Sequence, residues 1–238
     1  MDLNTMKKNV QKCVIVIPAF DPPSTLPQYV LSLKKEGFHH IVVVDDGSSI
    51  HSRSLFDDIS HEAVVLRHEE NRGKGAALKT AFRWIEENIS AGSRIITADA
   101  DGQHTSEDCL KLAESSFPEK ALYLGSRNFA LPGIPVRSRF GNRTTSFLFK
   151  LLYGTYLPDT QTGLRAFDRD LLPFMMRISG ERYEYEMHVL IACVKTGLPI
   201  LSIQSGTIYE NRNCSSHFHP LRDSWRVYRI LFRNVFRS

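Results

Sequence analysis

The stretch Cys13-Val-Ile-Val-Ile-Pro-Ala-Phe20 is the longest apolar run of the 238-residue chain, and the fold is built outward from it. It is much shorter than the roughly 20 apolar residues that a helix needs to cross a bilayer. Lysines precede it, as in a signal peptide, but Pro18 and the lack of a small-residue cleavage site argue against a signal peptide. Its β-branched residues and the turn signal Asp21-Pro-Pro23 predict a buried strand.

Apolar, β-branched segments alternate with helix-like segments after this first strand. Strands are expected at residues 13–17, 41–44, 64–66, 94–98 and 121–125. Helices are expected at 26–35, capped by Ser24 or Thr25 with Pro27 in its first turn, and at 55–59, 75–89 and 106–116. Strands that are apolar on both faces and separated by helices predict one α/β domain, with a mainly parallel sheet covered by helices on both faces. Further helices at 140–153 and 184–196 and short strands at 164–167 and 200–209 are expected to elaborate it.

Composition and charge exclude several classes of protein. A hydrophobic content of 42% and a charged content of 24% are ordinary for a globular domain and speak against disorder or a coiled coil. The four cysteines form no CxxC pair and no disulfide framework, which indicates a cytosolic protein. The net charge is +4, yet residues 211–238 hold six arginines and a single aspartate, so the basic character lies in the C-terminal tail.

Polar clusters follow four of the expected strands. They are Pro18-Ala-Phe-Asp21, Asp45-Asp-Gly-Ser48, Asp99-Ala-Asp-Gly-Gln-His104 and Gly125-Ser-Arg127. A helix cap would explain any one of them. Because open α/β sheets bind ligands beyond the carboxyl ends of their strands, four clusters at one edge predict a binding site there.

The third cluster carries the most specific chemistry. Asp99 and Asp101 stand two residues apart at a strand end, and Gln103 follows them. Oxygen-only ligands suit Mg²⁺ or Mn²⁺ rather than zinc, and such an ion commonly neutralises a departing diphosphate. The alternative is a turn rich in aspartate and glycine with no metal.

A glycine-rich segment, Asn71-Arg-Gly-Lys-Gly-Ala-Ala77, opens the helix at 75–89. Its backbone N–H groups are expected to cradle a phosphate. Leu78 breaks both the GxGxxG pattern of dinucleotide enzymes and the second glycine of a P-loop, so neither class is supported.

Five ordered segments together resemble the inverting GT-A glycosyltransferases, and most closely the polyprenyl-phosphate hexosyltransferases typified by dolichol-phosphate mannosyltransferase. The segments begin at Val14, Val43, Asn71, Asp99 and Gly125. The resemblance implies a GT-A (Rossmann-like) catalytic domain over residues 12–220, between an N-terminal tail (1–11) and a basic amphipathic C-terminal helix (221–238). It also implies transfer of a hexose, mannose or glucose, from a nucleotide-diphosphate sugar to a polyprenyl-phosphate carrier, with inversion and with Mg²⁺ or Mn²⁺.

The resemblance assigns roles to individual residues. The catalytic group would comprise Asp99, Asp101 and Arg127, and the metal ligands would be Asp99, Asp101 and Gln103. The nucleotide sugar would contact Pro18, Ala19, Phe20, Val44, Asp46, Lys74, Asp99, Ala100 and Asp101. The acceptor phosphate would meet Arg127, Arg212 and His217, with Arg139 and Arg143 as further candidates because they lie four apart on one helix face.

Several positions stay open at this point. The family commonly has Asn-Glu where this chain has Asp21-Pro22, so the nucleotide base is undetermined. Asp159 and Gln161 either line the sugar pocket or form a capped turn. Glu184 and Glu186 are expected to lie mostly on a solvated face or behind the site, because residues two apart on a helix do not face one ligand.

The acceptor's chemistry sets the expected mechanism. A hydroxyl acceptor needs a general base, whereas a phosphate monoester, with a second pKa of about 6, is largely dianionic at neutral pH. The protein then only has to position it, which arginines do by bidentate contact. The alternatives are a glycosyltransferase with another sugar acceptor, a nucleotidyltransferase, and an inactive membrane-associated scaffold.

The tail completes the sequence prediction. Arg222, Arg226, Arg229, Arg233 and Arg237 fall along one helical face beside aromatic and aliphatic residues. That pattern predicts a helix on the surface of an anionic membrane, and hence a cytoplasmic enzyme bound peripherally to the inner face of the membrane. Docking of the helix on its own domain is the main alternative. Nucleic acid is not expected as a partner because no recognised motif accompanies the arginines.

Overall fold

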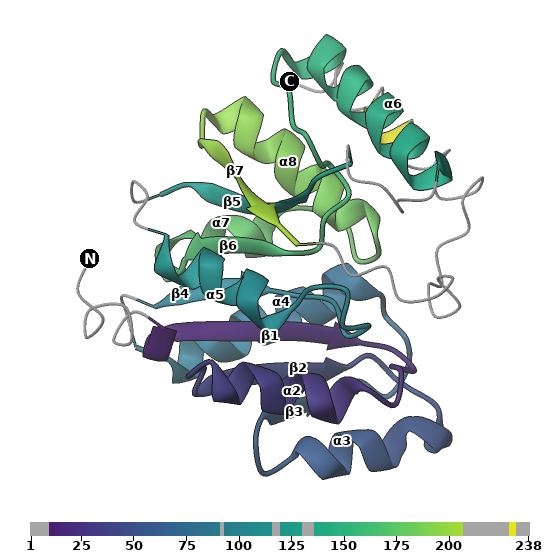
Figure 1. Cartoon of the computed structure of the whole chain (residues 1–238), viewed down its shortest axis with the longest axis vertical. Coiled ribbons are helices and arrows are strands. Elements are labelled where there is room, and N and C mark those ends of the chain that lie inside the picture. The colour runs from purple at the N-terminus through teal and green to yellow at the C-terminus, as the bar shows by residue number, and fades with distance from the viewer. Residues whose placement is uncertain (1–9, 91–92, 116–119, 130–135, 207–228, 232–238) are drawn as a thin grey trace.

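The computed structural model describes residues 10–90, 93–115, 120–129, 136–206 and 229–231. Seven strands form one sheet in the order β3-β2-β1-β4-β6-β5-β7 (Figure 1). Their bounds are β1 Cys13–Ala19, β2 His40–Asp45, β3 Val64–Arg67, β4 Arg94–Thr97, β5 Leu122–Arg127, β6 Arg165–Asp168 and β7 Ile200–Ser205. The α/β class and the mainly parallel sheet are confirmed.

One strand departs from the parallel pattern. β6 lies between β4 and β5 and runs antiparallel to both, with Ala166 opposite Ile96 on one side and Tyr123 on the other. Its first residues, not its last, therefore lie at the edge where the parallel strands end. The short apolar run at 164–167 predicts a strand but carries no information about its direction.

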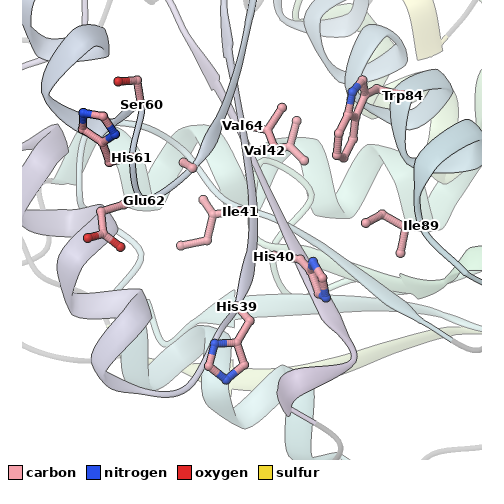
Figure 2. Close-up of a pocket in the computed structure, with 11 residues that line it drawn as sticks. His39, His40, Ile41, Val42, Ser60, His61, Glu62, Val64, Trp84 and Ile89 are labelled. Carbon is pink, nitrogen blue, oxygen red and sulfur yellow. The ribbon is translucent and has the colours of Figure 1, made fainter.

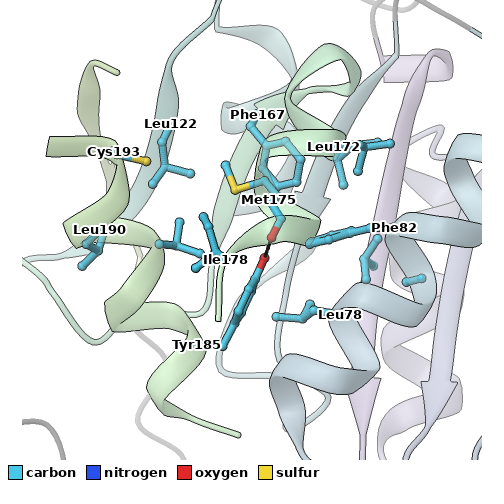
Figure 3. Packing of buried hydrophobic residues seen from close by; sticks show 14 of the residues in the cluster. Leu78, Phe82, Leu122, Phe167, Leu172, Met175, Ile178, Tyr185, Leu190 and Cys193 are labelled. Carbon is cyan, nitrogen blue, oxygen red and sulfur yellow. Dashed lines mark hydrogen bonds between the residues drawn. The ribbon is translucent and has the colours of Figure 1, made fainter. Parts of the chain in front are cut away.

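Helices cover both faces of the sheet, as expected. On one face lie α2 (Leu26–Lys35), α3 (Arg53–Ile59) and α5 (Ser106–Glu114), packed on Ile15, Val43 and Ile96. On the other face lie α4 (Lys74–Asn88), α7 (Leu172–Arg177) and α8 (Glu184–Thr196). Figure 3 shows this second core, where the rings of Phe82 and Phe167 meet edge to face at 5.4 Å between centroids. Helix α6 (Val136–Tyr153) joins the same core through Phe149, and Figure 1 shows it at the periphery.

Local details differ from the sequence prediction in three places. Thr25 occupies the N-cap position of α2 but makes no side-chain hydrogen bond, so the expected capping contact is wrong and Pro27 alone favours the helix start. Helix α7 and the short 3₁₀ turns at Ile50–Ser52 and Arg169–Leu171 were not anticipated, because segments of three to six residues show no periodicity. β7 ends at Ser205, and residues 207–209 of the expected strand lie outside the described residues.

Two further features concern the class of protein. Among the described helices, none combines the length and apolarity needed to span a membrane. Cys13, Cys109 and Cys193 are buried thiols, and burial raises the pKa of each to about 12, which makes them poor nucleophiles. Val10, within the segment assigned to the N-terminal tail, is buried in the same core as Ile15.

Candidate active site

The carboxyl ends of β1, β2, β4 and β5 and the first residues of β6 meet at one edge of the sheet, where the sequence places the four polar clusters. The clusters nevertheless differ in what their side chains contact. In some clusters the polar side chains are hydrogen-bonded to other groups of the protein, whereas in others the carboxylates are only partly neutralised. This difference separates the residues that build the site from those that can bind a ligand.

The carboxylates that end β2 are buried and fully used by the protein. Asp45 accepts hydrogen bonds from Arg67 Nε at 2.9 Å and from the backbone N–H of Ser48 at 2.9 Å. Asp46 accepts from the backbone N–H groups of Arg72 and Gly73, at 3.0 and 2.7 Å, and its Oδ1 lies 2.7 Å from His68 Nδ1. Asp46 thus fixes the glycine-rich segment in place. A contact between Asp46 and the nucleoside stays a prediction.

The expected phosphate cradle of backbone N–H groups is wrong for most of the glycine-rich segment. The N–H groups of Arg72 and Gly73 bind Asp46, and that of Ala76 donates to the carbonyl of Glu181 at 2.8 Å. A Cβ at Gly75 would lie 2.6 Å from the Tyr185 Cβ, so this glycine permits close approach of α4 to the 181–185 segment.

Lys74 is the residue of this segment that contacts carboxylates at this edge, those of Asp99 and Glu186. Its Nζ lies 2.6 Å from Asp99 Oδ1 and 2.9 Å from Glu186 Oε1, and its side chain is 14% exposed. Burial opposes the charge on Lys74, but the two carboxylates outweigh it and raise the pKa of this ammonium above its usual value. Glu186, expected on a solvated face or behind the site, is 13% exposed and contacts Lys74, which agrees with the second alternative. Glu184 points elsewhere and accepts from the backbone N–H groups of Glu181 and Arg182.

The Asp99–Asp101 pair is less completely neutralised than the pair on β2. Burial opposes ionisation of Asp99, but Lys74 and His104 hold the pKa of its carboxyl below the usual value. Burial and the negative charge of Asp99 raise the pKa of Asp101, which accepts a hydrogen bond from the backbone N–H of Gln103 at 3.1 Å. Two oxygen ligands whose charges repel one another fit a divalent ion. Among the described residues, no three His, Cys, Asp or Glu side chains gather in a metal-binding arrangement.

His104 and Gly163 shape the surroundings of Asp99. The N–H of Asp99 donates to the His104 ring at 3.1 Å, so His104 shapes the turn. A Cβ at Gly163 would lie 2.5 Å from Asp99 Oδ2, so only glycine fits there without displacing the carboxylate. Gly163 belongs to the segment that enters β6, which explains why an antiparallel strand contributes to this edge.

Arg127, at the end of β5, is held by a buried carboxylate. Its Nε donates to Asp159 Oδ2 at 2.7 Å and its Nη2 to Asp159 Oδ1 at 3.1 Å, while the Asp159 side chain is 0% exposed. Asp159 also accepts a hydrogen bond from the backbone N–H of Gln161. This contact is the one expected for a capped turn, the second alternative given for Asp159 and Gln161. Asn142 of α6 in turn donates to the carbonyl of Pro158 at 2.6 Å and accepts from the N–H of Thr160 at 3.1 Å.

The remaining predicted residues fall into three groups. Pro18, Ala19 and Val44 lie at the ends of β1 and β2, and Phe20 is exposed beside them. Arg139 and Arg143 lie on the exposed side of α6. Arg212 and His217 lie outside the described residues.

Two residues organise this edge through contacts that the sequence did not predict. Asp21, part of the first polar cluster, accepts hydrogen bonds from Ser49 and Ser52 at 2.8 and 2.9 Å, which ties the end of β1 to the loop after β2. The buried Arg165, which sequence reasoning missed, donates to the carbonyls of Thr162 and Glu186, at 3.0 and 2.7 Å, and so supports the start of α8. Their roles depend on contacts between segments far apart in the chain.

A cavity of about 260 Å³ lies elsewhere, beside the start of β2 and β3 (Figure 2). Ile41, Val42, Val64, Trp84 and Ile89 form its apolar part, and polar side chains including His39, His61 and Glu62 stand at its rim. It belongs to the amino ends of the strands. The candidate active site is therefore not this cavity but the opposite, carboxyl edge.

The sheet order, the single antiparallel strand and the acidic strand end beside a lysine and an arginine define a glycosyltransferase of the GT-A fold. The solved structure of glucosyl-3-phosphoglycerate synthase from Mycobacterium tuberculosis, with Mn²⁺, UDP and phosphoglyceric acid, has the same fold. Its TM-score is 0.73 at 17% identity, over 99% of this chain and 83% of that one. The chain belongs to glycosyl transferase family 2, which it matches over residues 14–173.

Two relatives resemble it over most of their length. An uncharacterized protein of Methanocaldococcus jannaschii, MJ1222, is 30% identical over 96% of this chain and 94% of its own. The UDP-N-acetylglucosamine–dolichyl-phosphate N-acetylglucosaminyltransferase of Methanococcus voltae is 28% identical over 82% of this chain and 85% of its own. Membership of the family rules out the nucleotidyltransferase alternative.

Proposed function

We propose that this glycosyltransferase moves a hexose from a nucleoside-diphosphate sugar to the phosphate of a polyprenyl carrier, with inversion and with a divalent ion. The observation that carries the proposal is the juxtaposition at the carboxyl edge. A charge-repelled acidic pair, Asp99 and Asp101, stands beside Lys74. An arginine held in a fixed orientation, Arg127, ends another strand at the same edge. The Methanococcus relative, named for a dolichyl-phosphate acceptor, supports the same class of reaction.

The acidic pair suits a divalent ion bound to a diphosphate. Asp99, Asp101 and the amide of Gln103 would hold Mg²⁺ or Mn²⁺, because all offer hard oxygen ligands. When bound, the ion supplies charge neutralisation on the departing nucleoside diphosphate. The solved neighbour with Mn²⁺ and UDP is consistent with this use of the edge.

Lys74 would contribute a second positive charge at the donor. Its ammonium stays protonated because Asp99 and Glu186 raise its pKa, so it can donate to a phosphate oxygen at every working pH. Glu186 contacts the same ammonium at 2.9 Å and helps to hold it beside Asp99. The ammonium is thus positioned before the donor arrives, which lowers the entropic cost of binding.

Arg127 would orient the acceptor phosphate. The bidentate contact with Asp159 uses Nε and Nη2 and fixes the guanidinium plane, so the positive charge that an acceptor phosphate would meet has a defined position. A phosphate oxygen attacking the anomeric carbon needs no general base, because its second pKa is about 6. The protein's contribution is therefore to align the attacking oxygen opposite the leaving diphosphate.

Membrane association would bring the enzyme to its lipid-borne acceptor on the cytoplasmic face. Of the basic tail, the structure describes only residues 229–231. Arg229 is exposed there, whereas Leu231 is 0% exposed and its carbonyl accepts a hydrogen bond from the Tyr153 hydroxyl at 2.9 Å. This contact is the one expected if the tail docks on its own domain. We propose that the tail arginines still face anionic lipid while Leu231 anchors the segment.

A transfer assay with water-soluble, short-chain polyprenyl phosphates tests the proposal without a membrane. The donors would be UDP-N-acetylglucosamine, UDP-glucose and GDP-mannose, each with Mn²⁺, with Mg²⁺ and with EDTA. We expect one donor to give a sugar phosphodiester of inverted anomeric configuration, determined by NMR, and EDTA to abolish it. Arg127→Lys should raise the acceptor KM by roughly tenfold or more, because a lysine cannot reproduce the fork. Transfer to phosphoglyceric acid but to no polyprenyl phosphate would instead identify a transferase with another acceptor.

A further inference from the structure

The outer face of α6 carries an apolar stripe that the protein leaves in solvent. Half of the large apolar side chains that are exposed in the described part of the chain fall within residues 140–156, namely Phe140, Phe147, Leu151 and Tyr156. Phe140, Phe147 and Leu151 are 72%, 62% and 68% exposed. Their spacing of seven and four residues places them along one line of an α-helix.

A basic stripe runs beside the apolar one. Arg139, Arg143 and Lys150 are all exposed, and their spacing of four and seven residues aligns them on the adjoining strip of the helix surface. The sequence of α6 contains four basic residues and no aspartate or glutamate. Lys150 Nζ lies 6.0 Å from the centre of the Tyr156 ring, so charge and aromatic surface adjoin at this end as well.

The inner face of α6 fixes this orientation. Phe149 is 0% exposed and packs against the Tyr153 ring at 4.9 Å between centroids. Asn142, 3% exposed, is hydrogen-bonded to both sides of Asp159. The helix is therefore held in one rotation, and the apolar stripe is a permanent part of the surface.

We infer that the stripe Phe140–Phe147–Leu151 inserts into the headgroup boundary of an anionic bilayer, with Arg139, Arg143 and Lys150 on lipid phosphates. Aromatic and aliphatic side chains beside a row of basic residues match the boundary between the acyl chains and the headgroups of an anionic bilayer, because the acyl chains are apolar and the headgroups are negatively charged. A second copy of the chain fits poorly. Three side chains provide far less area than the roughly 1,000 Å² of a specific interface, and a symmetric contact would place basic stripes together.

The docking surface is connected to the site. Asn142, on the buried side of the same helix, holds the turn whose Asp159 binds Arg127. A bilayer against the outer face of α6 would lie about one helix diameter, roughly 10 Å, from the turn that holds this arginine, which the proposed function assigns to the acceptor. The inference shares the lipid-borne acceptor with the proposed function but is carried by the exposed stripe, independently of the basic tail.

Vesicle binding tests it without any acceptor or donor. Full-length protein would be sedimented with phosphatidylcholine vesicles that contain or lack phosphatidylglycerol. We expect binding to the anionic vesicles, and a loss on the order of a hundredfold in the variant Phe140→Ser/Phe147→Ser/Leu151→Ser. Lys150→Gln should weaken binding about fivefold and only to anionic vesicles.

A matched control uses exposed apolar residues on other elements. Leu31 in α2 and Ile50 after β2 are 47% and 68% exposed, and Leu31→Ser/Ile50→Ser should bind vesicles like the wild type. The triple variant should keep its melting temperature and its transfer to short-chain acceptors in solution, so failure of docking and failure of the proposed function give different results. Undiminished vesicle binding by the triple variant overturns the inference. So does a wild-type dimer that becomes a monomer in the triple variant without vesicles.

Discussion

The strands on either side of β1 both end in a pair of carboxylates, yet the two pairs do different work. Asp45 and Asp46, at the end of β2, are 4% and 3% exposed and accept hydrogen bonds from five protein donors or rings. After β4, Asp99 pairs with Lys74 and has His104 beside it, Asp101 accepts from the backbone N–H of Gln103, and the two carboxylates repel each other. The first pair is engaged by protein donors, and the second is the pair that we propose binds a divalent ion.

This difference shows how one edge of the sheet can combine carboxylates that hold loops in place with carboxylates suited to binding a ligand. Buried carboxylates that accept several hydrogen bonds hold loops in place, because leaving any of those donors unpaired is costly. A pair with unbalanced charge is retained at a cost in stability, which is commonly the mark of a functional site. Substitutions at the two ends should therefore separate loss of stability from loss of activity.

The largest effect is expected at the second pair. Asp101→Asn keeps an acceptor for the Gln103 N–H but removes a charged metal ligand, so transfer should fall by about a thousandfold or more. The melting temperature should stay the same or rise, because a repulsion is removed. Initial rates at saturating donor and Mn²⁺, alongside thermal unfolding, measure both. Near-normal turnover would show that Asp101 is not part of the metal site.

The matched change at the first pair should act on stability. Asp46→Asn replaces one acceptor oxygen by a donor and leaves a buried N–H, such as that of Gly73, without its partner. We expect a loss of about 3 kcal/mol, which lowers the melting temperature by roughly 6 to 12 °C. Calorimetry checks this, and activity measured well below the transition should fall less than in Asp101→Asn. A stable but inactive variant would instead place Asp46 at the nucleotide.

Two glycines extend the comparison. Gly163→Ala would press a methyl group on the Asp99 carboxylate, which is 32% exposed and can move aside. Transfer should fall roughly ten- to a hundredfold through misplacement of Asp99, with little change in melting temperature. Gly47→Ala, with φ +72° and a Cβ 2.2 Å from the Glu70 carbonyl carbon, should lower the melting temperature instead. Steady-state kinetics and thermal unfolding of both variants decide whether the two ends differ in this way.

The smallest effect is expected at Glu186, which contacts Lys74. Glu186→Gln keeps an acceptor for Lys74 but removes a charge, so the donor KM should rise about three- to tenfold with kcat nearly unchanged. Glu184→Gln is the control, because Glu184 accepts hydrogen bonds from the backbone N–H groups of Glu181 and Arg182 in its own turn. Equal KM values in the two variants would mean that Glu186 does not position Lys74.

Much of this could be anticipated from the sequence. The β-branched runs ending in Asp45 and Asp99 predict strands and their shared edge, because strand periodicity and turn residues are local properties. Sequence reasoning could not distinguish the two aspartate pairs, since the partners of Asp46 come from residues 68–73 and those of Asp99 from α4. The contact of Glu186 with Lys74 could not be foreseen for the same reason. Its chemistry depends on Lys74, more than a hundred residues earlier.

The reversed direction of β6 also determines the order in which the site can form. Until residues 165–168 have left the ribosome and inserted, β4 is an unpaired strand edge and β5 has no neighbour on that side. Gly163 and Asp159 arrive with the same segment, so Asp99 and Arg127 gain their final surroundings together. A nascent chain that ends soon after β5 therefore carries β1 to β5 but an open sheet, which is prone to wrong pairing during synthesis.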